Sequence, residues 1–171
     1  MADLGDLCRD VPGFPKKGIV FKDITPLLRD KKVFGELIDQ ISDRYLDRDI
    51  DIVVSIEARG FILGPAIAYR LGAGVVPVRK RGKLPWHCYQ ETYDLEYGKD
   101  VVEIHQDAIK PGERVLIIDD LLATGGTVGA VINLVERLKG RIVEVAFLIE
   151  LASLKGRERI RDYPVFSLIQ C

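Results

Sequence analysis

The sequence has few residues suited to binding a metal or forming disulfides. Its three cysteines, Cys8, Cys88 and Cys171, are odd in number and far apart, so reduced thiols are expected rather than a disulfide framework. Only two histidines occur, His87 and His105, and isolated histidines do not form a zinc cluster. These shortages predict a globular protein with no metal site of its own.

Charge and hydropathy exclude two further classes. Lys and Arg number 25 against 26 Asp and Glu, a formal net charge of -1, so the basic excess typical of nucleic-acid binding is absent. No apolar run approaches the ~18 residues of a membrane span. Residues 1–7 are acidic and lack the cationic start and apolar middle of a signal peptide. We therefore expect a cytoplasmic protein with neither a nucleic-acid nor a membrane partner.

Residues 115–127 carry the most information, and they read Val-Leu-Ile-Ile-Asp-Asp-Leu-Leu-Ala-Thr-Gly-Gly-Thr. The apolar residues 115–118 predict a buried strand with Asp119 and Asp120 at its carboxyl end. A turn of small residues follows, and then a helix begins. Ligands of open α/β sheets lie beyond the carboxyl ends of strands, and the N–H groups of a helix N-terminus bind phosphate. Because carboxylates can accept hydrogen bonds from sugar hydroxyls, the segment predicts a sugar-phosphate site.

Other phosphate motifs fit this segment less well. A Walker A loop needs Lys after its last Gly, where Thr127 stands, and a Rossmann fingerprint needs three spaced glycines, where only Gly125 and Gly126 occur. The segment resembles the phosphoribosyl-diphosphate (PRPP) signature of type I phosphoribosyltransferases. The alternative is an ordinary strand–turn–helix unit with an acidic turn.

Hydrophobic periodicity predicts a single α/β domain over residues 1–171. Helices are expected at 33–45, 61–71 and 128–138, the last capped by Gly140. Strands are expected at 52–56, 75–78, 93–97, 101–105, 115–118, 142–149 and 165–169, with a turn at 98–100. Strands alternating with helices imply a doubly wound, mostly parallel sheet flanked by helices.

Glu57-Ala58-Arg59-Gly60-Phe61 comes directly after a predicted buried strand, at the same kind of sheet edge. Arg59 is placed to meet an anion near a helix start, and Gly60 permits close backbone approach. The alternative is a helix cap with a solvated Arg.

A cationic run follows the next strand and comprises Arg79, Lys80, Arg81 and Lys83. Such runs usually form a solvated surface. This one opens a long polar segment, 82–92, which predicts a flexible lid over about 82–95 whose cations close on a diphosphate. Lys83 is expected to reach inward and Arg81 to face water.

Glu96 lies on the polar side of the predicted strand 93–97, and an isolated Glu there is most often an ordinary exposed residue. Its phrase Leu95-Glu96-Tyr97-Gly98 nevertheless accompanies three other motifs, at 18–26, 57–61 and 115–127. Together the four motifs, from about Phe14 to Ile169, resemble the adenine phosphoribosyltransferases.

That resemblance implies transfer of the phosphoribosyl group of PRPP to adenine, giving AMP and pyrophosphate, with Mg²⁺ and in a homodimer. It implies a small N-terminal hood over about residues 1–30 and a cis peptide bond at Glu57–Ala58. It implies that Asp119 and Asp120 hold the ribose hydroxyls and that Glu96 is catalytic. The resemblance further implies that the 5′-phosphate is bound by Ala123, Thr124, Gly125, Gly126 and Thr127. The diphosphate would be bound by Arg59, Lys83 and, from the partner subunit, Arg79 or Lys80. Adenine would be bound by Val20, Phe21 and Lys22.

Two features qualify the resemblance. Lys22 stands where these enzymes often have Arg, which would weaken any bidentate or stacked contact made there. Residues 86–90 match no function. The competing functions are phosphoribosyl transfer to hypoxanthine, guanine or xanthine, a non-catalytic PRPP-sensing regulator, and a purely structural α/β domain.

Overall fold

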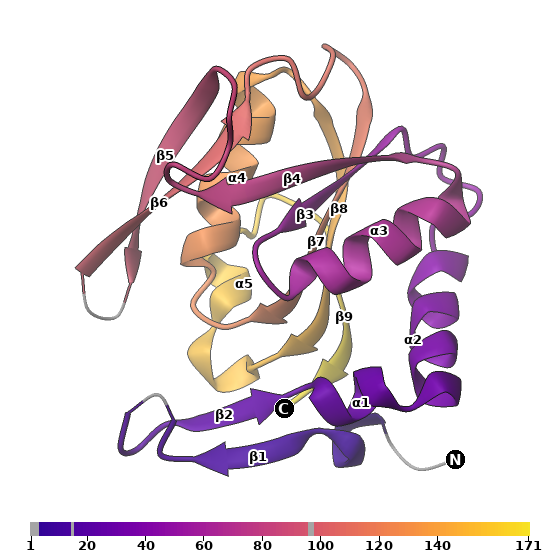
Figure 1. Cartoon of the computed structure of the whole chain (residues 1–171), viewed down its shortest axis with the longest axis vertical. Helices are drawn as coiled ribbons and strands as arrows, with labels where there is room; N and C mark the ends of the chain where they lie inside the picture. The colour runs from indigo at the N-terminus through magenta and orange to yellow at the C-terminus, as the bar shows by residue number, and fades with distance from the viewer. Residues whose placement is uncertain (1–3, 15, 96–97) are drawn as a thin grey trace.

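A seven-stranded sheet forms the centre of the computed structural model, which describes residues 4–14, 16–95 and 98–171 (Figure 1). Its strands are β3 (Ile52–Ile56), β4 (Gly74–Lys80), β5 (Cys88–Leu95), β6 (Gly98–His105), β7 (Arg114–Leu122), β8 (Arg141–Glu150) and β9 (Val165–Gln170). Their order is β5-β6-β4-β3-β7-β8-β9. The five strands from β4 to β9 are parallel, and the β5–β6 hairpin is antiparallel at one edge. The predicted mostly parallel sheet is confirmed.

Helices cover both faces of this sheet. They are α1 (Thr25–Arg29), α2 (Lys31–Asp43), α3 (Gly60–Leu71), α4 (Gly126–Arg137) and α5 (Gly156–Arg159), with short 3₁₀ turns η1 (Leu4–Leu7) and η2 (Ala152–Leu154). Because successive strand residues point to opposite faces, Val53 joins the core beneath α1, α2 and α3, while its neighbour Val54 joins the core beneath α4. The doubly wound arrangement follows from this two-sided burial. Within the described residues, no helix is long and apolar enough to cross a membrane.

The two central strands, β3 and β7, mark the point where the sheet changes direction. The chain leaves β3 through α3 towards β4 on one side, and leaves β7 through α4 towards β8 on the other. The connections depart to opposite faces, so a crevice opens outside the carboxyl ends of β3 and β7. The motifs at 57–61 and 119–127 both lie at this crevice.

A separate two-stranded sheet precedes α1. Strands β1 (Arg9–Pro12) and β2 (Val20–Asp23) pair antiparallel, and Figure 1 shows them below the main sheet, beside the C-terminus. Phe14 and Phe21 pack edge to face with ring centroids 5.2 Å apart. This sheet lies in the segment predicted to form the hood.

The strand boundaries predicted around residues 88–105 were wrong. Residues 98–100, predicted as a turn, belong to β6, where Gly98 pairs with Leu95 and Asp100 pairs with Tyr93. Strand β5 begins at Cys88, so residues 88–95 of the predicted lid are regular strand. The reason is cross-strand pairing. Strand β6 buries Val102 and Ile104, and the polar residues 88–95 form a strand because they pair with β6 along its whole length. Glu96 lies outside the described residues, and closure of this segment as a lid stays a prediction.

Candidate functional site

Asp119 and Asp120, the two acids of the 115–127 motif, lie where β7 extends past the end of β3. Strand β7 continues to Leu122, but its last pair with β3 joins Ile118 to Ser55. Asp119 and Asp120 therefore lie beyond the end of β3, at the edge of the crevice. Asp119 Oδ1 accepts the backbone N–H of Asp120 at 2.9 Å, and Asp120 Oδ2 lies 2.7 Å from Arg59 Nε.

These two carboxyl groups are electrostatically strained. Burial and the neighbouring Asp120 raise the pKa of Asp119 well above its ordinary value of 3.8. Burial also raises the pKa of Asp120, and the Arg59 guanidinium only partly offsets that effect. The ionised form of these carboxyl groups is therefore stabilised by any ligand that donates hydrogen bonds or brings positive charge. A sugar diol and a cation are ligands of this kind.

The turn after β7 forms a small cradle. A cavity of about 70 Å³ is lined by Asp119 and by residues 121–128. Gly125 has φ +79° and precedes α4, which begins at Gly126. The first backbone N–H groups of a helix have no partner within it, so this turn presents donors and the positive helix end to a bound anion.

The loop after β3 closes the other side of the crevice. Its Glu57–Ala58 peptide bond is cis, as the resemblance implied. A Cβ on Gly60 would lie 3.1 Å from both Asp119 Oδ1 and the Ile118 carbonyl oxygen, a tight contact, so the absence of a side chain lets α3 begin close to β7. The predicted close approach at Gly60 is confirmed.

The N-terminal sheet meets this loop through Phe21. The Arg59 guanidinium carbon lies 4.7 Å from the centre of the Phe21 ring, a cation–π contact. Phe21, Arg59 and Asp120 thus join three segments that are far apart in the sequence. Lys22 and Val20 lie on the opposite face of β2 from Phe21, since side chains alternate along a strand. Lys22 Nζ is 2.7 Å from Asp10, its cross-strand neighbour, so its charge is already paired.

The cations of β4 are held by carboxylates. Arg79 Nε and Nη2 lie 3.3 and 3.5 Å from the Glu57 carboxylate, which also accepts the Lys80 backbone N–H at 2.9 Å. Although burial opposes it, these hydrogen bonds lower the pKa of Glu57. Lys80 Nζ lies 3.1 Å from Asp100. Arg81 and Lys83 are exposed, as expected for Arg81.

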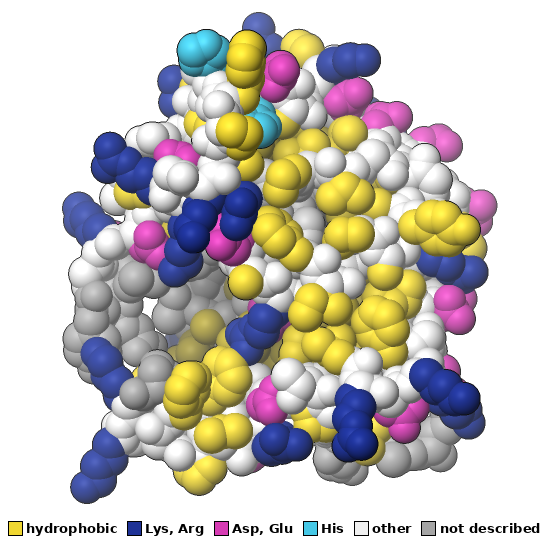
Figure 2. Space-filling view, viewed as in Figure 1, with side chains coloured by type: hydrophobic (Ala, Val, Ile, Leu, Met, Phe, Trp, Pro, Cys, Tyr) yellow, Lys and Arg dark blue, Asp and Glu magenta, His cyan; other side chains and the backbone are white. Residues whose placement is uncertain are grey.

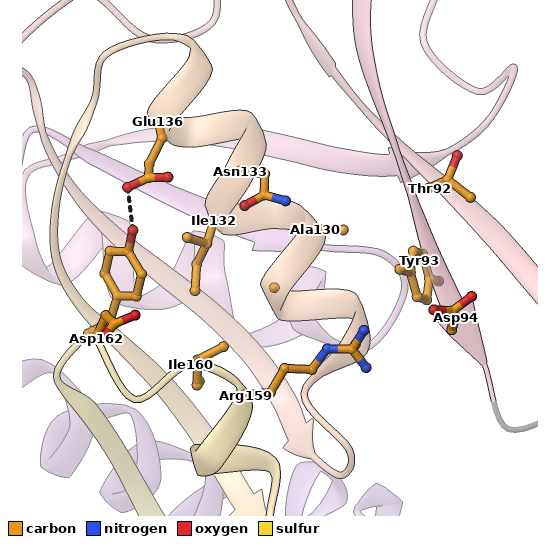
Figure 3. Close-up of a pocket in the computed structure, with 13 residues that line it drawn as sticks. Thr92, Tyr93, Asp94, Ala130, Ile132, Asn133, Glu136, Arg159, Ile160 and Asp162 are labelled. Carbon is orange, nitrogen blue, oxygen red and sulfur yellow. Dashed lines mark hydrogen bonds between the residues drawn. The ribbon is translucent and has the colours of Figure 1, made fainter.

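Two residues near the cradle carried no interpretable signal in the sequence. Tyr93 is 7% exposed and donates to Asp100 at 3.2 Å. Arg159 comes from α5 and lies beside Gly125 and Gly126. Both line a groove of about 400 Å³ between β5, α4 and the residues after α5 (Figure 3). Only the tertiary fold brings them to the cradle.

Comparison with known proteins agrees with this geometry. Residues 22–170 match the phosphoribosyl transferase domain. The chain is 59% identical to an adenine phosphoribosyltransferase from Trichlorobacter lovleyi, over 99% of both chains. It superposes on the crystal structure of adenine phosphoribosyltransferase from Rhodothermus marinus with a TM-score of 0.93 and 51% identity, covering 98% of this chain and 96% of that one.

A third relative was solved with ligands. The adenine phosphoribosyltransferase from Saccharomyces cerevisiae, complexed with an imino-altritol bisphosphate and adenine, matches with a TM-score of 0.91 and 41% identity over 98% of this chain and 99% of that one. Fold, site and full-length similarity all point the same way. The chain belongs to the phosphoribosyltransferase family and, within it, to the adenine phosphoribosyltransferases.

Proposed function

We propose that this chain transfers the phosphoribosyl group of PRPP to adenine, releasing AMP and pyrophosphate, as a step of purine salvage. The observation that carries the proposal is the line of contacts from Phe21 through Arg59 to Asp120. An aromatic face, a cation and a carboxylate lie side by side there, and we propose that this carboxylate binds the ribose diol. The yeast relative, which binds adenine together with a sugar-like bisphosphate, supports this combination of ligands.

The anomeric carbon of PRPP already carries an excellent leaving group, so no protein nucleophile is needed. Asp119 and Asp120 would accept hydrogen bonds from the ribose hydroxyls, and residues 123–127 would bind the 5′-phosphate. Arg59, Lys83 and, from the partner subunit, Arg79 or Lys80 would stabilise the departing diphosphate. Catalysis would thus come from orientation and from electrostatic stabilisation of an oxocarbenium-like transition state.

Mg²⁺ fits the donor set of this crevice as a metal delivered with the substrate. Among the residues that the structure describes, no group of three or more His, Cys, Asp and Glu side chains could hold a metal. Mg²⁺ commonly keeps several waters and binds through one or two carboxylates plus substrate phosphates. Bound mainly through PRPP and water, with Asp119 or Asp120 as the nearest protein carboxylates, the ion would neutralise charge on the diphosphate.

Base selectivity is the sharpest test of the proposal. Adenine offers an amine and an unprotonated N1, whereas hypoxanthine offers a carbonyl and a protonated N1. A site that pairs with adenine leaves polar groups unpaired against hypoxanthine, which can support discrimination of ~10⁴ in kcat/KM. Incubation with PRPP, Mg²⁺ and each purine in turn should give turnover with adenine. Comparable kcat/KM for hypoxanthine, guanine or xanthine would favour the alternative transferases, and no turnover with any base would favour a PRPP-sensing regulator.

Val20, Phe21 and Lys22 remain our proposed adenine contacts, with Phe21 the strongest of them. Its ring faces the crevice, whereas the Lys22 ammonium is paired with Asp10. Phe21→Ala should therefore raise the KM for adenine much more than Lys22→Ala does. Equal changes in the two variants would remove this ranking.

Glu96 is our proposed catalytic carboxylate, assisting proton transfer at the purine or stabilising the cationic sugar. Asp94, two residues earlier in the sequence, lies at the cradle, where a Cβ on Gly126 would be 3.0 Å from the Asp94 carbonyl oxygen. Glu96→Gln should lower kcat by ~10²–10⁴-fold with little change in either KM, because removing a positioned acid–base group acts on the transition state. Near-normal kcat would make Glu96 an ordinary strand glutamate.

We also propose a homodimer, in the cytoplasm. Ile62, Pro65 and Tyr69 are exposed along one face of α3, beside exposed Val75 on β4, and Figure 2 shows apolar side chains gathered on this face. Exposed apolar patches of this kind mark interaction surfaces. Light scattering should show a dimer that Tyr69→Asp weakens, and a monomeric wild-type chain would contradict the proposal.

A further inference from the structure

The short helix α5 rests directly on the proposed phosphate cradle. A Cβ on Gly125 would lie 2.7 Å from the Gly156 carbonyl oxygen, and a Cβ on Gly156 would overlap the Ala123 carbonyl oxygen. Neither position tolerates a side chain in this packing. The cradle and α5 therefore touch backbone to backbone, and this contact places the backbone of α5 beside the cradle.

This packing brings the Arg159 side chain along the cradle. A Cβ on Gly125 would lie 3.2 Å from Arg159 Cβ, and a Cβ on Gly126 would lie 3.5 Å from Arg159 Nη1. Figure 3 shows the guanidinium extending from α5 towards the first turn of α4. The charged end of Arg159 therefore lies beside the N-terminus of α4, where backbone donors converge.

Two neighbouring cations, Arg157 and Lys155, have carboxylate partners, whereas among the described residues Arg159 has none. Arg157 makes two hydrogen bonds of 2.7 Å to the buried Glu150, and Lys155 pairs with Glu158 at 3.8 Å. Asp94 and Asp162 line the same groove as Arg159. Within the described residues, however, no carboxylate oxygen lies within 4.0 Å of an Arg159 nitrogen. An unpaired guanidinium beside a positive helix end is an arrangement that a bound anion would stabilise.

We propose that Arg159 is a substrate-binding residue whose guanidinium contacts the 5′-phosphate of the donor and of the nucleotide product. This inference rests on the proposed function, because it takes residues 123–127 as the 5′-phosphate site. Those residues supply backbone donors and hydroxyl groups but no charged side chain. Arg159 supplies the cation from outside the motif, and its planar guanidinium can bind a phosphate through two N–H groups.

The test separates the two anionic ends of the donor. Ribose 5-phosphate carries only the 5′-phosphate, and pyrophosphate carries only the diphosphate. Binding of each to the full-length protein is measured by calorimetry for the wild type, Arg159→Gln, Arg159→Lys and the control Arg161→Gln. Arg161 is an exposed Arg two residues away that lies outside the Figure 3 groove.

Arg159→Gln should weaken ribose 5-phosphate binding about ten-fold, the effect of losing a hydrogen bond to a charged group at a partly solvated site. Pyrophosphate binding should change less than about two-fold, Arg159→Lys should fall between the wild type and Arg159→Gln, and Arg161→Gln should match the wild type. Unchanged ribose 5-phosphate binding in Arg159→Gln, equal losses for both ligands, an equal effect of Arg161→Gln, or no binding by the wild type would each overturn the inference. Selective loss in a chain that does not turn over adenine would sustain it while refuting the proposed function.

Discussion

Two buried carboxylates on neighbouring strands show how this molecule separates stability from chemistry. Glu144 on β8 and Asp120 on β7 are 3% and 5% exposed. Three guanidinium N–H groups, two from Arg44 and one from Arg48, reach Glu144 at 2.8 Å each. Asp120 has a single guanidinium contact, with Arg59. Burial is nearly equal at the two positions, but the supply of donors is not.

The direction of each pKa shift follows from the number of hydrogen-bond donors that reach the carboxylate. Burial raises the pKa of both groups, but at Glu144 the hydrogen bonds from Arg44 outweigh it, and the pKa is lowered. At Asp120 burial dominates, and the pKa is raised. A carboxylate whose lone pairs are filled by the protein holds the fold together, whereas an under-satisfied one is available to a ligand. The following variants test this contrast, from the largest expected effect to the smallest.

Removing the cation at the under-satisfied carboxylate should abolish most activity. Arg59→Gln should lower kcat/KM for adenine phosphoribosylation by roughly 10²–10³-fold, because a preorganised donor to developing negative charge is typically worth this much. Arg44→Gln is the matched control, since it removes an arginine from Glu144 instead. Steady-state kinetics should show normal kcat/KM for Arg44→Gln. Comparable losses in both variants would erase the contrast.

Removing the satisfied carboxylate should cost stability and leave chemistry intact. Glu144→Gln should destabilise the fold by about 2–3 kcal/mol, below the usual range for a buried pair because Arg44 and Arg48 are 42% and 39% exposed and can be hydrated. Calorimetry should show a Tm lower by about 5–10 °C. Because the folded pKa of Glu144 lies below its ordinary 4.5, the contribution is complete above that pH and is lost as pH falls through the folded pKa. A Tm gap between wild type and variant that widens in acid would contradict this assignment.

Replacing Asp119 should have the opposite effect, weakening ligand binding while stabilising the fold. Asp119→Asn should weaken PRPP binding about ten-fold through loss of a charged acceptor. It should also raise the Tm at neutral pH, because the folded pKa of Asp119 is raised and ionisation is therefore penalised in the folded state. The gain should vanish as pH falls below the ordinary pKa of 3.8, where the wild-type carboxyl is neutral in both states. Thermal melts across pH measure the change in Tm, and a PRPP titration measures the change in affinity. A variant Tm below that of the wild type at pH 7 would contradict the expected destabilisation by ionised Asp119.

The smallest effect is expected at Tyr93. Tyr93→Phe removes the hydroxyl that donates a hydrogen bond to Asp100, and should cost about 1 kcal/mol of stability. Tyr89 is the control on the same strand, where the ring stacks against Arg137 at 3.9 Å. Tyr89→Phe should leave the denaturant midpoint nearly unchanged. If the two variants shift it equally, the hydroxyl of Tyr93 has no special role.

The sequence by itself determined the parts of the site that are continuous in the chain. Residues 115–127 form a strand, turn and helix through local pattern alone: apolar residues bury the strand, Gly125 adopts the positive φ, and the apolar stripe sets α4. The two-sided packing of β3 and β7 also follows from local pattern, since a run of apolar residues is buried on both faces. Strands β3 and β7, with the turn and helix α4 that follow β7, form the crevice and so favour a sugar-phosphate ligand.

The tertiary structure decided which side chains meet there. Arg59 with Asp120, Lys22 with Asp10, and Arg159 with the cradle are contacts between segments whose spacing in the sequence says nothing about their distance in space. Even a local feature shows the limit. The sequence predicted Gly140 as the residue that ends α4 by its backbone freedom, but Lys139 takes the positive φ of 61°. Gly140 is needed because a Cβ there would lie 2.9 Å from Val135 and 3.1 Å from Ile109, and such a lack of space arises only once the core has packed.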